Sequence, residues 1–233
     1  MARRNPIHLN RLLAGLSARD RALLAPDLAP AELALRQVLE APGKAISTIY
    51  FIEHGIASVV AGDPGRDIEV GIIGREGMTG AAILLGNRSS PLSTYMQIAG
   101  AGQRIRTPAL RRALRQSPSL HAAFLKYVPV FLTQTAHTAL VNGRFRLDAR
   151  LARWLLMAHD RMDGRRLPLT HEFLGVMLGV GRPIVTVTLS ALERQGLIKV
   201  ERGSITLLDR RGIRAIAGRS YAGPEPALRR QRR

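Results

Sequence analysis

The segment from Leu169 to Leu208 limits the possible folds of this chain more than any other stretch. It contains two short helical patterns on either side of Gly179, followed by a strand, a turn and a second strand. Thr170 is a suitable N-cap for a first helix over 171–177, because its hydroxyl can accept from the backbone N–H groups of the first turn. Gly179 can supply the positive φ of a tight turn. This order of signals predicts a helix-turn-helix.

The two helices of this motif need a close approach and a shared apolar core. Gly175 has no side chain where the second helix must cross the first. Pro183 fits the first turn of the second helix, where its missing N–H is not needed. The apolar positions expected between the two helices are Leu174, Leu178, Val180, Val185 and Leu189.

A hairpin is expected directly after the second helix. Gly196–Val200 is one strand, 201–204 is a turn, and Ile205–Leu208 is the returning strand. Such a hairpin is the wing of a winged helix-turn-helix, and Arg202 at its tip would lie along DNA phosphates.

The residues predicted to contact DNA lie at the starts of both helices, along the second helix and at the tip of the wing. Arg182 stands at the beginning of the second helix, the end that enters the major groove. Arg182 could instead be a solvated helix-terminal arginine, and Thr186, Thr188 and Ser190 could be exposed polar residues without a DNA contact. The predicted set is Thr170, His171, Gly181, Arg182, Pro183, Thr186, Val187, Ser190 and Arg202.

The charge balance favours a polyanionic partner. The chain has 35 basic and 17 acidic residues and a formal net charge of +18, and its only lysines are Lys44, Lys126 and Lys199. A basic excess of this size on a folded chain favours double-stranded DNA. Part of the charge lies in a tail over 221–233 that we expect to be disordered, where it adds unspecific phosphate affinity or only solubility.

Several classes are excluded by composition. The chain has no cysteine, which removes disulfides, iron–sulfur clusters, thiolate zinc sites and cysteine nucleophiles. No apolar stretch approaches the roughly 20 residues of a membrane span, and no secretory signal is visible, so we expect no membrane partner. These features fit a cytoplasmic protein.

The first half of the chain has the pattern of an antiparallel β-roll. Short apolar runs between about Glu32 and Arg106 are broken by turn residues every ten or so positions, and His54–Gly55 is one expected turn. A jelly roll suits this spacing because it covers most strand edges. The expected strands are 33–39, 48–52, 56–60, 68–73 and 95–98.

A long apolar helix is expected from Pro118 to Val141, with Asn142–Gly143 as its C-cap. Because Lys126 is its only clearly charged residue, a second copy of the chain is the simplest partner for it. Pro129 either kinks this helix or divides it in two. A further amphipathic helix is expected over 146–161. The predicted dimer positions are Leu120, Phe124, Val128, Phe131, Leu132 and Thr135.

The order of these parts resembles the Crp/Fnr family, which includes the cyclic-AMP receptor protein. The resemblance implies an α+β fold with a β-roll of the cyclic-nucleotide-binding type, a dimerisation helix and a winged helix-turn-helix. It implies a homodimeric transcription regulator, not an enzyme, with a two-fold DNA site, a small-molecule effector and RNA polymerase as partners. The corresponding domains are 1–107, 108–142 and 143–220, followed by the tail over 221–233.

The effector site departs from that of the cyclic-nucleotide binders. The matching positions are Gly77, Gly80, Ala81, Ser93 and Thr94. Ala81 stands in the glutamate position and Leu92 in the arginine position, so a cyclic phosphate would lose a bidentate charge-assisted contact. We therefore expect that cyclic AMP is not a tight ligand. The iron–sulfur branch is excluded by the lack of cysteine, and His54 is the only histidine for a haem in the roll, so no cofactor is expected.

The recognition helix departs from the receptor as well. Arg182 matches its first base-reading arginine and can take guanine O6 and N7. Pro183 replaces a glutamate and Val187 replaces a second arginine, so the target sequence should differ.

Two other classes of function remain open at this point. A cupin-like metal enzyme would need clustered histidines, but His8, His54, His121, His137, His159 and His171 are scattered. A regulatory module that uses the roll to bind another protein is the second alternative, and the net charge argues against it.

Overall fold

The computed structural model describes residues 9–62 and 67–221. The chain divides into two compact units: unit 1 comprises Met1–Ala57 and Ile73–Pro129, and unit 2 comprises Ser58–Ile72 and Val130–Arg233. This division differs from the domains expected from the sequence, because the segment 58–72 groups with the C-terminal part of the chain. The expected tail lies outside the described residues from 222 onward, whereas Tyr221 is buried.

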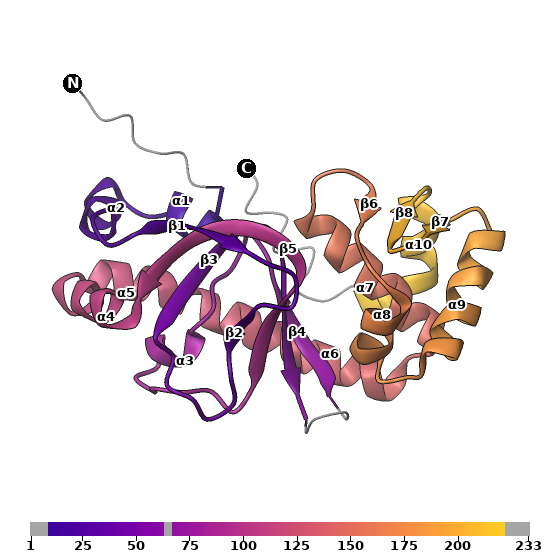
Figure 1. Cartoon of the computed structure of the whole chain (residues 1–233), viewed down its shortest axis with the longest axis horizontal. Helices are drawn as coiled ribbons and strands as arrows, with labels where there is room; N and C mark the ends of the chain where they lie inside the picture. Colours follow the sequence, from indigo (N-terminus) through magenta and orange to yellow (C-terminus); the bar gives the residue numbers. More distant parts are fainter. Residues whose placement is uncertain (1–8, 63–66, 222–233) are drawn as a thin grey trace. The chain divides into compact units, whose positions relative to one another are not determined.

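An antiparallel sheet dominates the first half of the chain (Figure 1). Its strand order is β1-β5-β3-β4, and β2 also pairs with β5. β1 and β5 are antiparallel, with Ala29 opposite Arg104. The strands are β1 (Ala29–Leu33), β2 (Val38–Glu40), β3 (Thr48–Ala61), β4 (Ile68–Ile73) and β5 (Ser93–Arg106). The helices of this half are α1 (Arg11–Ala14), α2 (Ala18–Leu24), α3 (Ala81–Leu84), α4 (Thr107–Gln116) and α5 (Pro118–Leu125).

Two expected strand boundaries were wrong. The segment 33–39 is not one strand, because the chain turns between β1 and β2 with Arg36 at a φ of 65°. Conversely, the chain does not turn at His54–Gly55, where β3 continues as one strand of 14 residues. Gly55 has a φ of 84°, and a Cβ there would lie 2.5 Å from the Ile98 carbonyl oxygen. The glycine therefore serves a close strand approach and not a hairpin turn.

The core of unit 1 contains two residues that we expected at a dimer interface. Leu120 and Phe124 on α5 are fully buried, and the Phe124 ring lies 5.5 Å from that of Phe51 on β3, centroid to centroid. Helical spacing indicates an apolar face but not the surface that covers it, and here the covering surface belongs to the same chain.

The helical segment after Pro118 is divided at Lys126, between α5 and α6 (Tyr127–Arg144). Pro129 is the third residue of α6, within the first turn, where its missing N–H breaks no intrahelical hydrogen bond. The sequence left open whether Pro129 kinks one long helix or divides it in two, and the structure has two helices. The expected C-cap at Asn142–Gly143 was wrong, because α6 continues through both residues to Arg144.

Unit 2 contains the predicted helix-turn-helix and wing. A three-stranded sheet of order β6-β8-β7 forms the wing, so the expected hairpin has a third strand that the sequence did not indicate. The α+β class, the antiparallel N-terminal sheet and the C-terminal winged helix-turn-helix are confirmed. Besides α6, the elements are α7 (Leu147–Arg161), β6 (Arg166–Leu167), α8 (His171–Leu178), α9 (Arg182–Arg194), β7 (Ile198–Glu201), β8 (Ser204–Leu207), α10 (Arg210–Ala217) and η1 (Gly218–Tyr221).

Among residues 9–62 and 67–221, no single helix is long and apolar enough to cross a membrane. Only α8 and α9 taken together pass that test of length and composition, and this pair is bent by 104°.

Candidate nucleic-acid interface

The turn between α8 and α9 has the geometry that its glycines predicted. Thr170 Oγ1 accepts from the Phe173 backbone N–H at 3.3 Å and caps α8. Gly179 ends α8 with a φ of 63°, and the two helices then diverge by 104°. A Cβ on Gly175 would lie 2.9 Å from the Val180 carbonyl oxygen, so a side chain there would collide with the backbone that leads into α9.

The second helix of the motif, α9, has one buried face and one exposed face. Its buried residues are Val185, Leu189 and Leu192, which fall at the spacing of one helical side. On the other side, Val187 is 68% exposed and Ile184 is 52% exposed. Ile184 was not in the predicted set of DNA contacts. Its position two residues after Arg182 in the sequence could have indicated it. The predicted residues Arg182, Pro183, Thr186, Val187 and Ser190 are all exposed.

A pocket of about 500 Å³ joins the start of α8, the start of α9 and the tip of the wing. Four of the predicted residues line it together: Thr170, His171, Arg182 and Arg202. Gly203 at the wing tip has a φ of 74°, which allows the tight turn between β7 and β8. Two acidic residues that sequence reasoning missed, Glu172 and Glu201, also line this pocket. Their charge limits how closely a phosphate can approach that side.

A side-chain bridge connects the two helices of the motif. His171 Nδ1 lies 2.9 Å from Thr186 Oγ1, and that hydroxyl donates to the Arg182 carbonyl at 3.1 Å. Since a hydroxyl has one proton, the His171 Nδ1–H must donate to Thr186. Burial and the Arg182 charge lower the pKa of His171, so the neutral ring is favoured. This bridge holds the N-terminal ends of α8 and α9 together.

The C-terminal end of α8 is held by α7. The Arg150 guanidinium donates to the Leu178 carbonyl, one residue before the turn, and to Asn142 Oδ1 at 3.1 Å. Arginine can satisfy the free carbonyls of a helix end and interacts favourably with its dipole. Sequence reasoning did not single out Arg150, because this contact joins elements far apart in the chain.

A buried carboxylate ties the segment 58–72 to the same helices. Glu69 on β4 accepts from Ser58 Oγ at 2.6 Å and from Trp154 Nε1 at 2.6 Å. Ser58 Oγ also lies 3.8 Å from the Met177 sulfur on α8. Burial raises the pKa of Glu69 to about 7, although both hydrogen bonds and nearby arginines oppose the shift. Trp154 is therefore part of the core with a satisfied indole N–H.

The expected effector positions converge on a second buried carboxylate. Gly80, at a φ of 74°, donates its backbone N–H to the Glu40 side chain. Ser93 Oγ lies 3.5 Å from the Glu40 carbonyl oxygen, and Thr94 pairs with Glu40 across β2 and β5. Burial raises the pKa of Glu40. Sequence reasoning missed Glu40, which stands far in the chain from the five expected positions.

The two remaining effector positions have different surroundings. A Cβ on Gly77 would lie 2.6 Å from the Tyr127 hydroxyl oxygen, so Gly77 permits a close packing contact. Ala81 is the first residue of α3. The structure therefore brings Gly80, Ser93 and Thr94 together around Glu40, whereas Gly77 lies against α6.

The comparison with known proteins agrees with this geometry. Residues 149–216 match the family model of the Crp-like helix-turn-helix domain. The transcriptional regulatory protein btr of Bordetella pertussis is 27% identical over 121 residues, which cover 49% of this chain and 50% of that protein. The chain thus spans about half the length of this curated relative.

Solved structures with low sequence identity have the same fold. A Crp/Fnr-family regulator of Eubacterium rectale matches with a TM-score of 0.69 at 17% identity, over 90% of this chain and 98% of that one. A CRP-family regulator of Thermus thermophilus matches with a TM-score of 0.65 at 22% identity, over 81% of this chain and 96% of that one.

Residues 149–216 thus form a Crp-like helix-turn-helix domain, and the chain has the fold of Crp/Fnr-family structures. The match to a Crp-like helix-turn-helix domain favours a DNA-binding protein over the cupin-like metal enzyme.

Proposed function

We propose that this protein acts in the cytoplasm as a homodimer that binds a two-fold DNA site with a pair of α9 helices. The observation that carries the proposal is the pocket that Arg182 and Arg202 line together with Thr170 and His171. In this arrangement Arg182 reads a guanine in the major groove, while Arg202 and the Thr170 hydroxyl hold phosphates.

The exposed face of α9 indicates which bases follow that guanine. Val187 and Ile184 are apolar and exposed where a DNA-reading helix usually has polar residues. Apolar side chains in the major groove contact the methyl group of thymine. We propose that each half-site contains thymine next to the guanine read by Arg182, and that cytosine readout by a glutamate is absent because Pro183 occupies that position.

The dimer contact that we propose lies on the outer face of α6. The inner face packs on the same chain: Gln134 Oε1 accepts from the Ile72 backbone N–H at 2.7 Å, and Phe131 lies against Gly71. The outer face carries an uncharged, exposed stripe at helical spacing, made of Leu132, Ala136, Ala139 and Leu140. Small and apolar residues at this spacing allow two helices to pack closely. Of the six positions predicted from the sequence, Leu132 belongs to this stripe.

The effector of the roll is proposed to be a compound other than cyclic AMP. Glu40 occupies the region of Gly80, Ser93 and Thr94, where a cyclic phosphate would be held in a nucleotide-binding relative. A buried acidic group close to a phosphate is unfavourable, and the arginine that would compensate is replaced by Leu92. Calorimetry should detect no micromolar binding of cyclic AMP, and tight binding would refute this part of the proposal. RNA polymerase is the second macromolecular partner that we propose.

The test of DNA recognition is selection of bound fragments from random DNA, followed by binding measurements with Arg182→Ala. The selected site should be two-fold, and Arg182→Ala should cost about 1–3 kcal/mol at one base pair and relax specificity there. Arg194→Ala is the matched control, because Arg194 is also exposed on α9 but at the opposite end. An equal loss on every sequence would make Arg182 a phosphate contact and refute base readout.

A further inference from the structure

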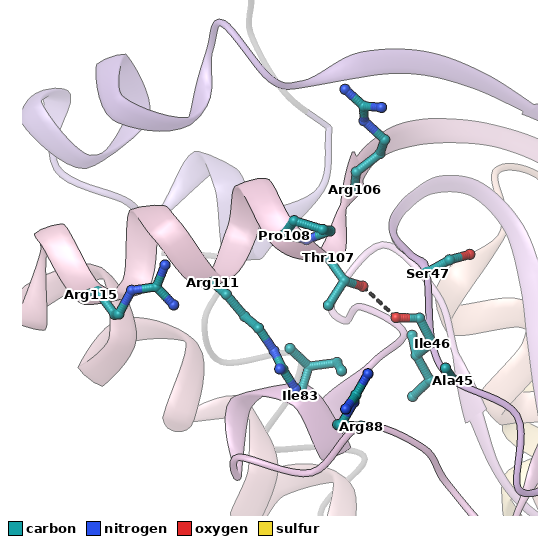
Figure 2. Close-up of a pocket in the computed structure, with 10 residues that line it drawn as sticks. All are labelled: Ala45, Ile46, Ser47, Ile83, Arg88, Arg106, Thr107, Pro108, Arg111 and Arg115. Atoms are coloured by element: carbon teal, nitrogen blue, oxygen red, sulfur yellow. Dashed lines mark hydrogen bonds between the residues drawn. The ribbon is translucent and has the colours of Figure 1, made fainter.

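A second pocket lies within unit 1, at the start of α4, outside the group of roll residues around Glu40. Its volume is about 520 Å³, which falls in the range of small-molecule sites. Figure 2 shows the pocket between the start of α4, the loop at Ala45–Ser47 and the segment that carries Ile83 and Arg88. We refer to it below as the α4 pocket.

Arginine supplies all the charge of the α4 pocket. Arg88, Arg106, Arg111 and Arg115 line it, and no carboxylate does among the residues that the structure describes. Figure 2 shows Arg111 extending from α4 toward Arg88, whereas Arg106 points away from both. Two guanidinium groups on one side of a pocket repel each other unless an anion stands between them.

These arginines are not used by ion pairs within the described part of the chain. The guanidinium groups of Arg88, Arg106 and Arg115 make no hydrogen bond or ion pair there. Arg111 Nη2 donates to the Asn87 carbonyl at 2.7 Å, which orients this side chain and leaves its other N–H groups free. The neighbouring Arg112 differs, because it forms an ion pair with Asp27 at 2.7 Å. Arg115 on α4 and Arg88 near α3 therefore line the pocket without an ion pair.

The rest of the lining is apolar and held in place. Ile46 and Ile83 are buried, and Pro108 adds an apolar edge at the first turn of α4. Thr107 Oγ1 donates to the Ile46 carbonyl at 2.6 Å, and this bond fixes α4 to the opposite wall (Figure 2). Arg106, the N-cap of α4, gives no side-chain hydrogen bond to the helix in the described structure. The Thr107 N–H donates to the Ser47 carbonyl at 2.9 Å and Pro108 has no N–H, so the positive potential of the pocket comes from the arginines.

We propose that the α4 pocket binds a small molecule that combines a phosphate or diphosphate group with a flat apolar part, as a nucleotide does. Arg88 and Arg111 hold the phosphate oxygens, since a guanidinium group offers paired donors that match them. Ile46, Ile83 and Pro108 contact the apolar part. The site is separate from the roll positions at which the family resemblance places an effector, and it involves none of the proposed DNA contacts.

The proposal is tested by calorimetry on the full chain with ADP, pyrophosphate and adenosine as probes. ADP should bind saturably, and pyrophosphate and adenosine should each bind at least about tenfold more weakly. Arg88→Gln/Arg111→Gln should weaken ADP binding at least about tenfold, whereas Arg104→Gln should leave it unchanged. Arg104 is a matched control, because it is an exposed arginine on β5 that does not line the pocket.

Three results would overturn the proposal: no saturable binding of ADP, an equal loss with Arg104→Gln, or unchanged binding in the double variant. Pyrophosphate binding as tight as that of ADP would refute the nucleotide part and leave a phosphate site. The thermal midpoint of each variant shows whether it is folded, and the single variants Arg88→Gln and Arg111→Gln replace the double variant if it is not. Arg182→Ala should bind ADP like the unaltered protein. A failure of the proposed DNA recognition can therefore be distinguished from a failure of the proposed ligand site in the α4 pocket.

Discussion

Trp154 donates its indole N–H to Glu69 across 2.6 Å, and this bond joins α7 to β4 inside unit 2. The second carboxylate oxygen of Glu69 accepts from Ser58, which precedes β4 in the chain. A fully buried carboxylate is unfavourable in its charged form, even with two donors, and its pKa of about 7 reflects this. The segment 58–72 is therefore attached to α7 through a group that titrates near neutral pH.

Glu69 should make stability fall as the pH rises. In the unfolded chain the carboxyl has its ordinary pKa of about 4.5, whereas in the folded protein its pKa is raised to about 7. The stabilising contribution of Glu69 to the free energy of unfolding is therefore fully present below pH 4.5 and is lost as the pH rises from 4.5 to 7. The total change is about 3 kcal/mol. Glu69→Gln should remove this slope, as measured by urea unfolding across that range. An unchanged slope in the variant would contradict the assignment to Glu69.

Ser58→Ala should have a larger effect when Glu69 is charged. Ser58 is fully buried and donates to Glu69 at 2.6 Å, and a hydrogen bond to an ionised acceptor is the stronger kind. The variant should lose about 1–3 kcal/mol of unfolding free energy above the Glu69 pKa, and less below it. In the Glu69→Gln background the difference between the two pH conditions should vanish. A loss independent of pH in both backgrounds would mean that Ser58 matters only for packing.

Gly55→Ala should destabilise unit 1 through two separate effects. Gly55 has a φ of 84°, and a Cβ would also lie 2.5 Å from the Ile98 carbonyl oxygen. Gly43→Ala is the control, because Gly43 has a φ of 69° but nothing within 4 Å of its built Cβ. Gly55→Ala should cost about 1–3 kcal/mol more than Gly43→Ala in denaturant unfolding. Equal losses would show that the strand contact relaxes easily.

Leu132→Glu should convert the proposed dimer into a monomer. Leu132 is 65% exposed on α6, and a carboxylate in a close helix–helix contact would lose its hydration without a partner. Leu35→Glu is the control, because Leu35 is 52% exposed and lies between β1 and β2, outside α6 in the sequence. Sedimentation velocity should show a monomer for the first variant and a dimer for the second. A dimer in both would exclude this stripe as the contact.

The sequence alone determined the features that depend on neighbouring residues. The N-cap at Thr170, the turn at Gly179 and the first-turn proline of α9 are short-range signals, and each predicted element lies where its signal stood. The hairpin of the wing was also predicted from short-range signals, and Gly203 at its tip has a positive φ. Local signals suffice here because a cap or a tight turn is stabilised within a few residues.

Only the tertiary structure decided what covers each apolar face and what surrounds each buried charge. Periodicity marked Leu120 and Phe124 as buried, but it could not tell a dimer contact from the core of the same chain. Glu40 and Glu69 were missed because their partners lie distant in the chain. Their roles depend on pairing between strands and helices that come together only in the folded protein, and a pattern of spacings does not contain that pairing.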